Sequence, residues 1–395
     1  MRKKSLFLVL SLSAIAGLWT GCSKDEVVEA PAGSRAISFR MQGGLPSLRA
    51  TGTTADYVNA FVVNAYGDST GVDHTGSGGP NRKATMLGTT VYRLEGVTST
   101  FDYNPKAFYY AEDDSVHFSA YSPVSKNIGS GLGLGDTKHE NKITYTVLPP
   151  DTLRGNTQQE DLLVAFTTKL KTDFGTAVSL DFKHALSRVY VKATNLLSET
   201  AIIDTIRLVN LYDTGTLDID DDTWAATTTT PPVNPVDKPK SINESYYNSI
   251  TAMGDMSDYK ILWTPSGSQD KTFTYALPAS GVAVPGGGPG AAAVSVVSVE
   301  QGMLLLPQTV WKHSTFNDAT DFYLEIHYKV ANIEETTKFS FADVNAIGAA
   351  AAAEKGITFE FGRQYALNIT FNNAGISFSI SVEAWDTPVI DVSKP

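Results

Sequence analysis

Apolar and polar residues alternate along short stretches of this chain, and this period of two constrains its fold more than any other feature. In residues 322–330 every second residue is apolar or aromatic, and the residues between them are Tyr, Glu, His and Lys. Because successive side chains of a β-strand point to opposite faces, this stretch predicts a strand with one buried face. Similar stretches, separated by turn residues roughly every ten positions, are typical of an all-β protein.

The repeating strand pattern predicts two β-sandwiches in tandem, of the transthyretin-like or Greek-key type. We place the N-terminal sandwich at residues 36–174 and the C-terminal one at 175–395. Residues 57–66 are apolar on both faces, which indicates a central strand. The proline-rich segment 227–240 and the glycine-rich segment 281–290 predict surface loops.

One helix and one hairpin are expected in the C-terminal sandwich. The alanine-rich stretch Val344–Lys355 is the only segment whose composition favours a helix. Asn372–Gly375 predicts a hairpin turn, because Asn and Gly tolerate the backbone angles that a tight turn needs. It leads into residues 376–384, where Ile376, Phe378, Ile380 and Val382 would share one face.

The first 22 residues indicate export and lipid attachment. Three cations precede a short apolar run that ends at Cys22 and resembles a bacterial lipobox, and an acidic tether (23–35) follows. The resemblance implies cleavage before Cys22 and acylation of its thiol and amine. An ordinary signal peptide with an incidental cysteine, or a reactive thiol, are the alternatives. Lipidation is favoured because Cys22 is the only cysteine in 395 residues.

The net charge of the chain limits the partners that it could bind through electrostatic attraction. The chain holds 31 basic and 42 acidic residues, a formal net charge of −11 at pH 7, and loss of the three cations of the signal segment would make it −14. A chain this acidic is not expected to bind nucleic acid or anionic membrane surfaces through its charge.

The sequence offers little catalytic chemistry. Its six histidines are scattered without a metal-binding spacing, so each is expected on the surface or in a turn. No nucleophile or phosphate-binding motif occurs between a strand and a helix. The acidic stretch Asp218–Asp222 could hold calcium but lacks the glycine and distal glutamate of an EF-hand, so a simple acidic turn is favoured. We therefore expect neither an enzyme nor a bound cofactor or metal.

Several motifs, in order along nearly the whole chain, together resemble the fimbrillin (Mfa-like) family of type V pilus subunits. The lipobox and its acidic neighbours come first, and the other motifs are ISF at 37–39, LRAT at 48–51, FVVNAYG at 61–67, HFSAYSP at 117–123, DLLVA at 161–165, LDFKHALSRVYVKATN at 180–195, LLLPQT at 304–309, FEFGRQYALNITF at 359–371 and SVEAWD at 381–386.

The resemblance implies a precursor that reaches the outer membrane as a lipoprotein and is trimmed by an arginine-specific protease. The cut maps to the bond between Arg49 and Ala50, with Arg35 and Arg40 as competing sites. Trimming would remove the strand Ala36–Met41, which we interpret as a placeholder. A strand from another fimbrillin subunit would then fill the exposed groove, in a head-to-tail contact that builds a surface filament for adhesion.

The resemblance also indicates which segment would be donated. The donor is expected in the region 376–395, with Ile376, Phe378, Ile380, Val382, Val389 and Ile390 as the inserting side chains. Stalk, tip and anchor positions in the filament all remain open.

Two other functions compete with this hypothesis. A surface glycan-binding lipoprotein would share the β-sandwich and the anchor, and would use Trp224, Trp263 and Trp311 as sugar platforms. A secreted hydrolase ranks third, since the sequence shows no catalytic motif.

Overall fold

The computed structural model describes residues 35–41, 58, 60–68, 83–93, 100–109, 113–124, 141–148, 159–221, 245–246, 259–266, 268–275, 277–299, 302–310, 317–319, 321–340 and 357–385. These residues are almost entirely β-structure, as predicted. Within them the only helix is a single 3-10 turn at Lys171–Asp173. The helix expected at Val344–Lys355 lies outside the described residues.

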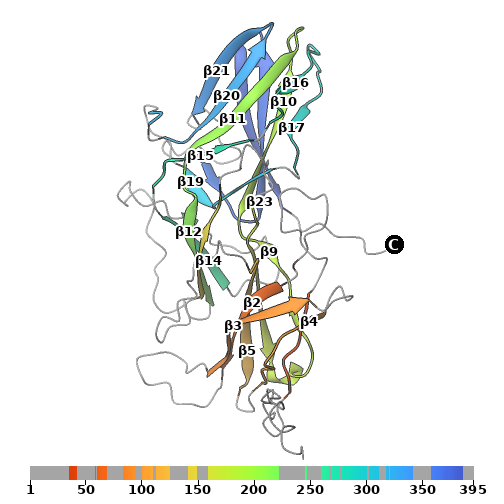
Figure 1. Cartoon of the computed structure of the whole chain (residues 1–395), viewed down its shortest axis with the longest axis vertical. Coiled ribbons are helices and arrows are strands. Elements are labelled where there is room, and N and C mark those ends of the chain that lie inside the picture. The colour runs from red at the N-terminus through yellow and green to blue at the C-terminus, as the bar shows by residue number, and fades with distance from the viewer. Residues whose placement is uncertain are drawn as a thin grey trace, which may run out of the picture.

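One eight-stranded sheet fills the lower part of the molecule (Figure 1). Its strands, in spatial order, are β8 (Val178–Leu180), β1 (Phe39–Met41), β4 (Thr100–Asp102), β3 (Lys83–Arg93), β2 (Ala60–Asp68), β5 (Ser115–Ser122), β7 (Leu163–Leu170) and β9 (Lys183–His184). β2 lies between β3 and β5, so the prediction of a central strand near residues 57–66 is confirmed.

The eight-stranded sheet curls over itself around one hydrophobic core. Strands that lie four places apart in a flat sheet are separated by roughly 19 Å. The ring of Phe39 on β1 nevertheless packs 5.9 Å from that of Phe118 on β5, four places away. The sheet therefore folds back so that β1 covers the middle strands.

Two sheets face each other in the upper part of the molecule (Figure 1). The first contains β10 (Ser187–Asn195), β17 (Val294–Val297), β18 (Met303–Leu305), β23 (Arg363–Asn372) and β24 (Gly375–Ala384). The second contains β11 (Ala201–Leu211), β15 (Lys271–Thr274), β16 (Val282–Val284), β20 (Tyr323–Val330) and β21 (Ile333–Ser340).

The strand predicted within 322–330 is confirmed in this upper sandwich, but its expected outward residues Tyr323 and Glu325 are buried as well, at 7% and 9% exposure. Phe322, Leu324, Ile326 and Tyr328 belong to its core, and Val330 packs against it. The turn at Asn372–Gly375 joins β23 to β24 in an unbroken antiparallel register, as expected. In contrast, the segment 281–290 is not all loop, because β16 pairs with β11 at residues 282–284.

Two smaller sheets complete the structure. One contains β13 (Ser245–Tyr246), β14 (Tyr259–Ser266), β12 (Thr214–Asp221) and β6 (Asn141–Thr146), and the other pairs β19 (Gln308–Val310) with β22 (Ile357–Phe359). The acidic turn expected at Asp218–Asp222 is wrong for its first four residues. Their backbone belongs to β12, which pairs on one side with β14 and, as far as Ile219, on the other with β6.

Strand pairing crosses the position at which we expect the domain seam. β8 and β9 follow residue 175 but pair with β1 and β7 of the lower sheet. β6 precedes residue 175 but pairs with β12. The division into 36–174 and 175–395 stays a prediction, and the sheets around it are interleaved.

The two cores meet along β7, whose side chains alternate between them. Leu163 and Ala165 belong to the lower core, whereas Val164 and Phe166 belong to the upper one. Gln159, just before this strand and 1% exposed, donates to the carbonyls of Leu148 and Leu304, each at 3.0 Å, and accepts the Leu304 N–H at 2.8 Å. One amide thus links the chain beside β7 to β18.

We predict that Gln159→Leu lowers the free energy of unfolding by about 1–3 kcal/mol, because it leaves buried backbone groups of Leu304 without partners. Denaturant unfolding followed by fluorescence measures this loss. Gln364→Leu is the control, since that amide bonds only to the side chains of Arg188 and Glu383 among the contacts described for it. An equal or greater loss in the control would contradict the assignment.

Candidate functional site

Strand β1 and the residues before it combine strict alternation with almost complete burial of one face. Ile37, Phe39 and Met41 are 1%, 2% and 7% exposed and belong to the lower core. Ser38 and Arg40 between them are exposed. A short segment therefore supplies three neighbouring side chains to the core, one at every second position.

Phe39 occupies the centre of an aromatic pocket. Its ring lies 5.6 Å from that of Phe61, 5.7 Å from that of Tyr103 and 5.9 Å from that of Phe118, at angles from 59° to 85°. Edge-to-face packing of this kind stabilises aromatic pairs beyond the area that they bury. The pocket thus favours a flat aromatic side chain at the middle position.

Both edges of β1 are paired with neighbouring strands. Phe39 lies opposite Phe101 of the antiparallel strand β4 and opposite Val178 of the parallel strand β8. The pairing continues before the strand, where the Ile37 N–H donates to Ala107 O at 2.9 Å and the Tyr109 N–H donates to Arg35 O at 3.1 Å. On the other side the Val178 N–H donates to Ser38 O at 2.7 Å.

Loss of β1 would leave a defined groove between β4 and β8. Its floor would be the aromatic pocket, and its walls would be two strand edges with unpaired N–H and C=O groups. Such edges pair readily with another extended chain. The geometry therefore suits the capture of a strand with apolar residues at alternate positions.

The structure describes two of the three arginines considered as cleavage sites. Arg40 is paired on both sides, opposite Thr100 and Ser179. Arg35 donates through its guanidinium to Phe174 O and accepts a backbone bond from Tyr109. Arg49 and Ala50 lie outside the described residues, as does the lipidation candidate Cys22.

The donor candidates lie on an edge strand. β24 pairs only with β23 and so has one open edge among the described residues. Ile380 is buried, Ile376 and Phe378 are partly buried against the upper core, and Val382 is 43% exposed. Val389 and Ile390 lie outside the described residues.

The end of β24 is anchored beside His184, a residue that sequence reasoning misplaced. We expected a surface or turn histidine, but His184 is only 4% exposed. Its Nδ1 contacts the Asp161 carboxylate, and its ring stacks on Trp385 at 3.8 Å. The Arg188 guanidinium also lies 4.3 Å from the Trp385 ring centroid. The contacts of His184 with Asp161 and with Trp385, both distant in the sequence, explain its burial, and no local sequence pattern predicts them.

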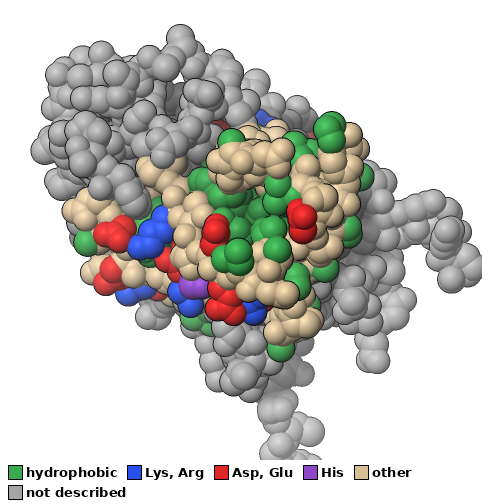
Figure 2. Space-filling view, turned by 90° about the horizontal axis from the view of Figure 1, so that it is seen from above, with side chains coloured by type: hydrophobic (Ala, Val, Ile, Leu, Met, Phe, Trp, Pro, Cys, Tyr) green, Lys and Arg blue, Asp and Glu red, His purple; other side chains and the backbone are tan. Residues whose placement is uncertain are grey.

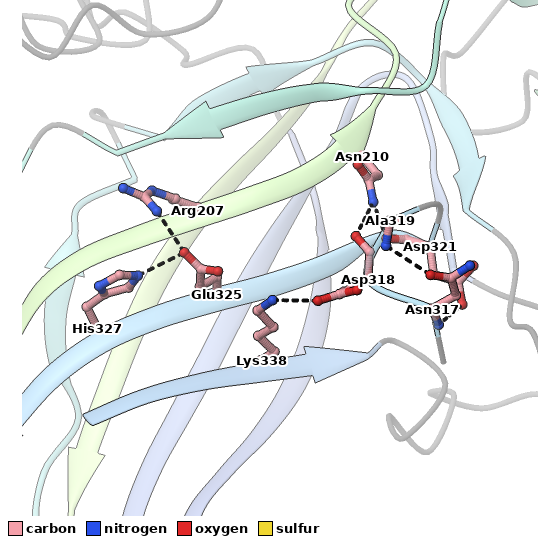
Figure 3. A network of polar contacts seen from close by, with 9 residues as sticks. All are labelled: Arg207, Asn210, Asn317, Asp318, Ala319, Asp321, Glu325, His327 and Lys338. Atoms are coloured by element: carbon pink, nitrogen blue, oxygen red, sulfur yellow. Dashed lines mark hydrogen bonds and ion pairs between the residues drawn. The ribbon is translucent and has the colours of Figure 1, made fainter. Parts of the chain in front are cut away.

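A polar network covers the outer face of β11, β20 and β21 (Figure 3). Glu325 Oε1 accepts from Arg207 Nη1 and contacts His327 Nε2, both at 2.8 Å. Burial raises the pKa of Glu325, but the hydrogen bonds from His327 and Arg207 outweigh it, so the net pKa lies below its ordinary value. The network stabilises this face with charges that satisfy one another.

The other candidate sites receive no support from the described residues. Within them, no group of three or more His, Cys, Asp or Glu residues gathers that could hold a metal ion. Trp224 and Trp311 lie outside the described part of the chain, and only the backbone of Trp263 is described, in β14. In the same part of the chain, no helix is long and apolar enough to cross a membrane.

Comparison with known families identifies the chain. The model of the fimbrillin-like family matches residues 49–385. The chain belongs to the fimbrillin-like family. The match begins at Arg49 and does not include β1.

The solved structures that match the chain include three fimbrial proteins. A fimbrial protein from Bacteroides vulgatus has 16% sequence identity and a TM-score of 0.47, and the alignment covers 89% of this chain and 100% of that one. A fimbrial assembly protein from Parabacteroides distasonis has 9% identity and a TM-score of 0.35, with coverage of 89% and 98%. The tip fimbrial protein Mfa3 from Porphyromonas gingivalis, with C-terminal truncation, has 8% identity and a TM-score of 0.37, with coverage of 89% and 100%. No curated protein matches the sequence.

In this fimbrillin-like protein we predict that Phe39→Ala lowers the free energy of unfolding by about 3–5 kcal/mol, because it empties the aromatic pocket. Arg40→Ala, on the exposed face of the same strand, should change it by less than about 0.5 kcal/mol. Denaturant unfolding of the uncleaved chain measures both. Similar losses in the two variants would show that β1 is not packed as described.

We also predict a loss of stability in acid that depends on Glu325. Because its folded-state pKa is lowered, this carboxylate stabilises the fold above the unfolded-state pKa of about 4.3, and the stabilisation is lost as the pH falls through the folded-state pKa. Glu325→Gln should flatten the dependence of the unfolding free energy on pH below about pH 4.3. Glu334→Gln, whose side chain is 77% exposed, controls for the lost charge.

Proposed function

We propose that this chain is a structural subunit of a cell-surface pilus that is assembled by head-to-tail strand exchange and supports adhesion. The observation that carries the proposal is β1, a short strand buried on one face and paired on both edges. Family membership supports a structural role in a fimbria rather than an enzymatic one.

In the precursor, β1 would occupy the groove between β4 and β8. While the strand remains joined to the chain, its effective concentration at the groove is high, on the order of millimolar, and another strand competes poorly. Cleavage of the connection would make β1 a separate peptide that can leave. The same cut would free the body from a lipid on Cys22, so release from the outer membrane and exposure of the groove would coincide.

Cleavage after Arg49 suits this scheme better than cleavage at the other two arginines. A protease must draw an extended segment into its active site, and the backbones of Arg35 and Arg40 are engaged in strand pairing. A cut at either would also leave part of the placeholder in the groove. A cut after Arg49 would release all of residues 35–41.

The replacement strand would come from the region 376–395 of a neighbouring subunit. β24 is an edge strand, so its departure would not divide its sheet. Ile376, Phe378, Ile380 and Val382 alternate along it, and Val389 and Ile390 continue the apolar pattern in the sequence. This contact is not self-complementary, and it therefore grows a filament instead of closing a dimer.

We predict that an arginine-specific protease converts the purified precursor, cut after Arg49, into polymers that migrate as a ladder on gels without denaturant. Arg49→Ala should remain monomeric under the same treatment, because its placeholder is retained. Arg40→Ala is the matched control and should be cut and polymerise like the wild type. Mass spectrometry of the new N-terminus identifies the cut. Trimmed wild-type protein that stays monomeric would refute the proposed function.

A further inference from the structure

Strand β21 has an open edge in the described part of the chain. It pairs with β20 along all eight of its residues and with no other described strand. In Figure 1 it forms the outer strand at one side of the upper sandwich, away from the groove between β4 and β8. An edge strand offers a row of N–H and C=O groups to a further extended segment. β21 is therefore a candidate contact with another polypeptide.

The turn before β21 determines which of its backbone groups face outward. Ala331 and Asn332 have positive φ angles of 50° and 65°. Such a two-residue turn makes the residues that flank it, Val330 and Ile333, a hydrogen-bonded pair. Hydrogen-bonded and non-hydrogen-bonded pairs alternate along an antiparallel ladder. The backbone groups of the odd-numbered residues of β21 therefore face β20, and those of the even-numbered residues face the open edge.

A second copy of β21, running antiparallel, fits this edge in a limited set of registers. Only even-numbered residues are suited to the hydrogen-bonded pairs, because only their backbone groups face the edge. The register centred on Thr336 places Glu334 of each copy opposite Lys338 of the other. In the same register, Ile333 of each copy lies opposite Phe339 of the other. The two-fold symmetry forms both kinds of pair twice.

This register is self-complementary in charge and in apolar surface. The pairs of Glu334 with Lys338 occupy the polar outer face of the sheet. The pairs of Ile333 with Phe339 occupy the face from which Phe339 packs against the upper core. Opposite charges and aromatic–β-branched pairs both stabilise neighbouring strands. A shift of two residues in either direction separates the charge pairs, and one of the two shifts sets Glu335 opposite its own counterpart.

The side chains of these pairs are accessible to a partner. Ile333 is 64% exposed, the highest value among the large hydrophobic side chains of the described residues. The Glu334 side chain is 77% exposed and contacts Lys329 at 3.2 Å, and Lys338 contacts Asp318 at 2.8 Å (Figure 3). Exposed ion pairs of this kind contribute little to stability. Their exchange for pairs across the contact would therefore cost little, and Ile333 would leave water.

The charges around this edge do not oppose contact between two copies, although the chain has a net charge of −11. On the outer face of the sheet, Arg207 lies 2.8 Å from Glu325. Lys329 lies 3.6 Å from Asp204. Figure 2, which views the upper end of the molecule, shows acidic and basic side chains interspersed along one side of the described surface, beside a hydrophobic patch. Interspersed charges produce no single-sign field that would repel a copy.

A second open edge of the upper sandwich, that of β24, lacks this pattern. Glu383 is the only charged residue among its ten residues, so no register pairs opposite charges between two copies of it. Charged residues on an edge strand usually prevent sheets from pairing. On β21 their order instead fits a copy of the same strand. The self-complementary pattern is therefore a property of β21 and not of edge strands in general.

We propose that β21 is a contact between two copies of this chain, which pair antiparallel along it in the register centred on Thr336. A two-fold contact of this kind closes at two copies. It uses no residue of the groove between β4 and β8, so it goes beyond the proposed function and does not depend on it. Between filaments of such subunits, the contact would join neighbours side by side, and many weak contacts along their length would reinforce one another.

Exchange of the charges tests the contact in solution. Glu334→Lys sets Lys opposite Lys at both ends of the contact, and Lys338→Glu sets Glu opposite Glu. Sedimentation equilibrium of the uncleaved chain, in a Cys22→Ser background, should show that each variant associates about tenfold more weakly than the parent. An equimolar mixture of the two variants should associate like the parent, because opposite charges again face one another in the mixed dimer.

Thiol cross-linking in the same background reads the register directly. In the proposed register Glu335 of one copy lies opposite Thr337 of the other in a non-hydrogen-bonded pair. Their Cα atoms would be about 4.5 Å apart, within the range that a disulfide spans. Oxidation of a mixture of Glu335→Cys and Thr337→Cys chains should therefore give the mixed disulfide. Like residues would lie about 8 Å apart, so neither variant should cross-link alone.

The matched control is the double variant Glu334→Lys/Lys338→Glu, which has the composition of the parent and should associate equally well. Melting curves of the single variants show that they are folded before they are mixed. Parent-like association of both folded single variants would overturn the inference, as would a mixture that fails to recover it. Absence of the mixed disulfide, or cross-linking of Thr337→Cys with itself, would overturn the register. None of these outcomes involves trimming, so they are independent of the test of the proposed function.

Discussion

The lower half of this protein depends on a strand that satisfies two requirements at once. β1 completes the hydrogen-bond ladders of β4 and β8, and its buried face, which begins at Ile37, closes the core. Neither requirement specifies the strand by itself, because any extended chain can pair with an edge. Their combination demands an extended segment with side chains of the right volume at alternate positions. The position between β4 and β8 therefore restricts which segment can fill it. It does not require that this segment be covalently attached to the rest of the chain.

The β-architecture could be predicted from the sequence because its signal is local. Alternation in 322–330 and the Asn-rich turn at 372–375 identified β20 and the β23–β24 hairpin. In contrast, β1 pairs with β8, so that Phe39 lies opposite Val178, far along the sequence. No local sequence pattern predicts a pairing over such a distance. The burial of His184 likewise depends on stacking against Trp385, which lies far from it in the sequence, at the end of β24.

The acidic stretch at 218–221 shows how tertiary structure overrides local preference. Aspartate disfavours strands in general, so a turn was the natural expectation. Leu217 is fully buried, however, and β12 pairs with β14 as far as Asp221 and with β6 as far as Ile219. Strand pairing, on two edges as far as Ile219 and on one edge beyond it, determines the conformation more strongly than the intrinsic preference of the aspartates. The candidate groove follows the same logic, since it is built from pairing and packing and not from a reactive motif.

The shared strand β7 has a mechanical consequence. Its side chains point alternately into the lower and the upper core, so the two halves of the molecule are not joined by a flexible tether. A tensile force applied along the long axis would have to slide β7 past β5, with which it pairs over eight residues. Many hydrogen bonds would then resist in parallel, and both cores would bear the load together. A subunit built in this way is stiff under tension, a property that a filament exposed to flow requires.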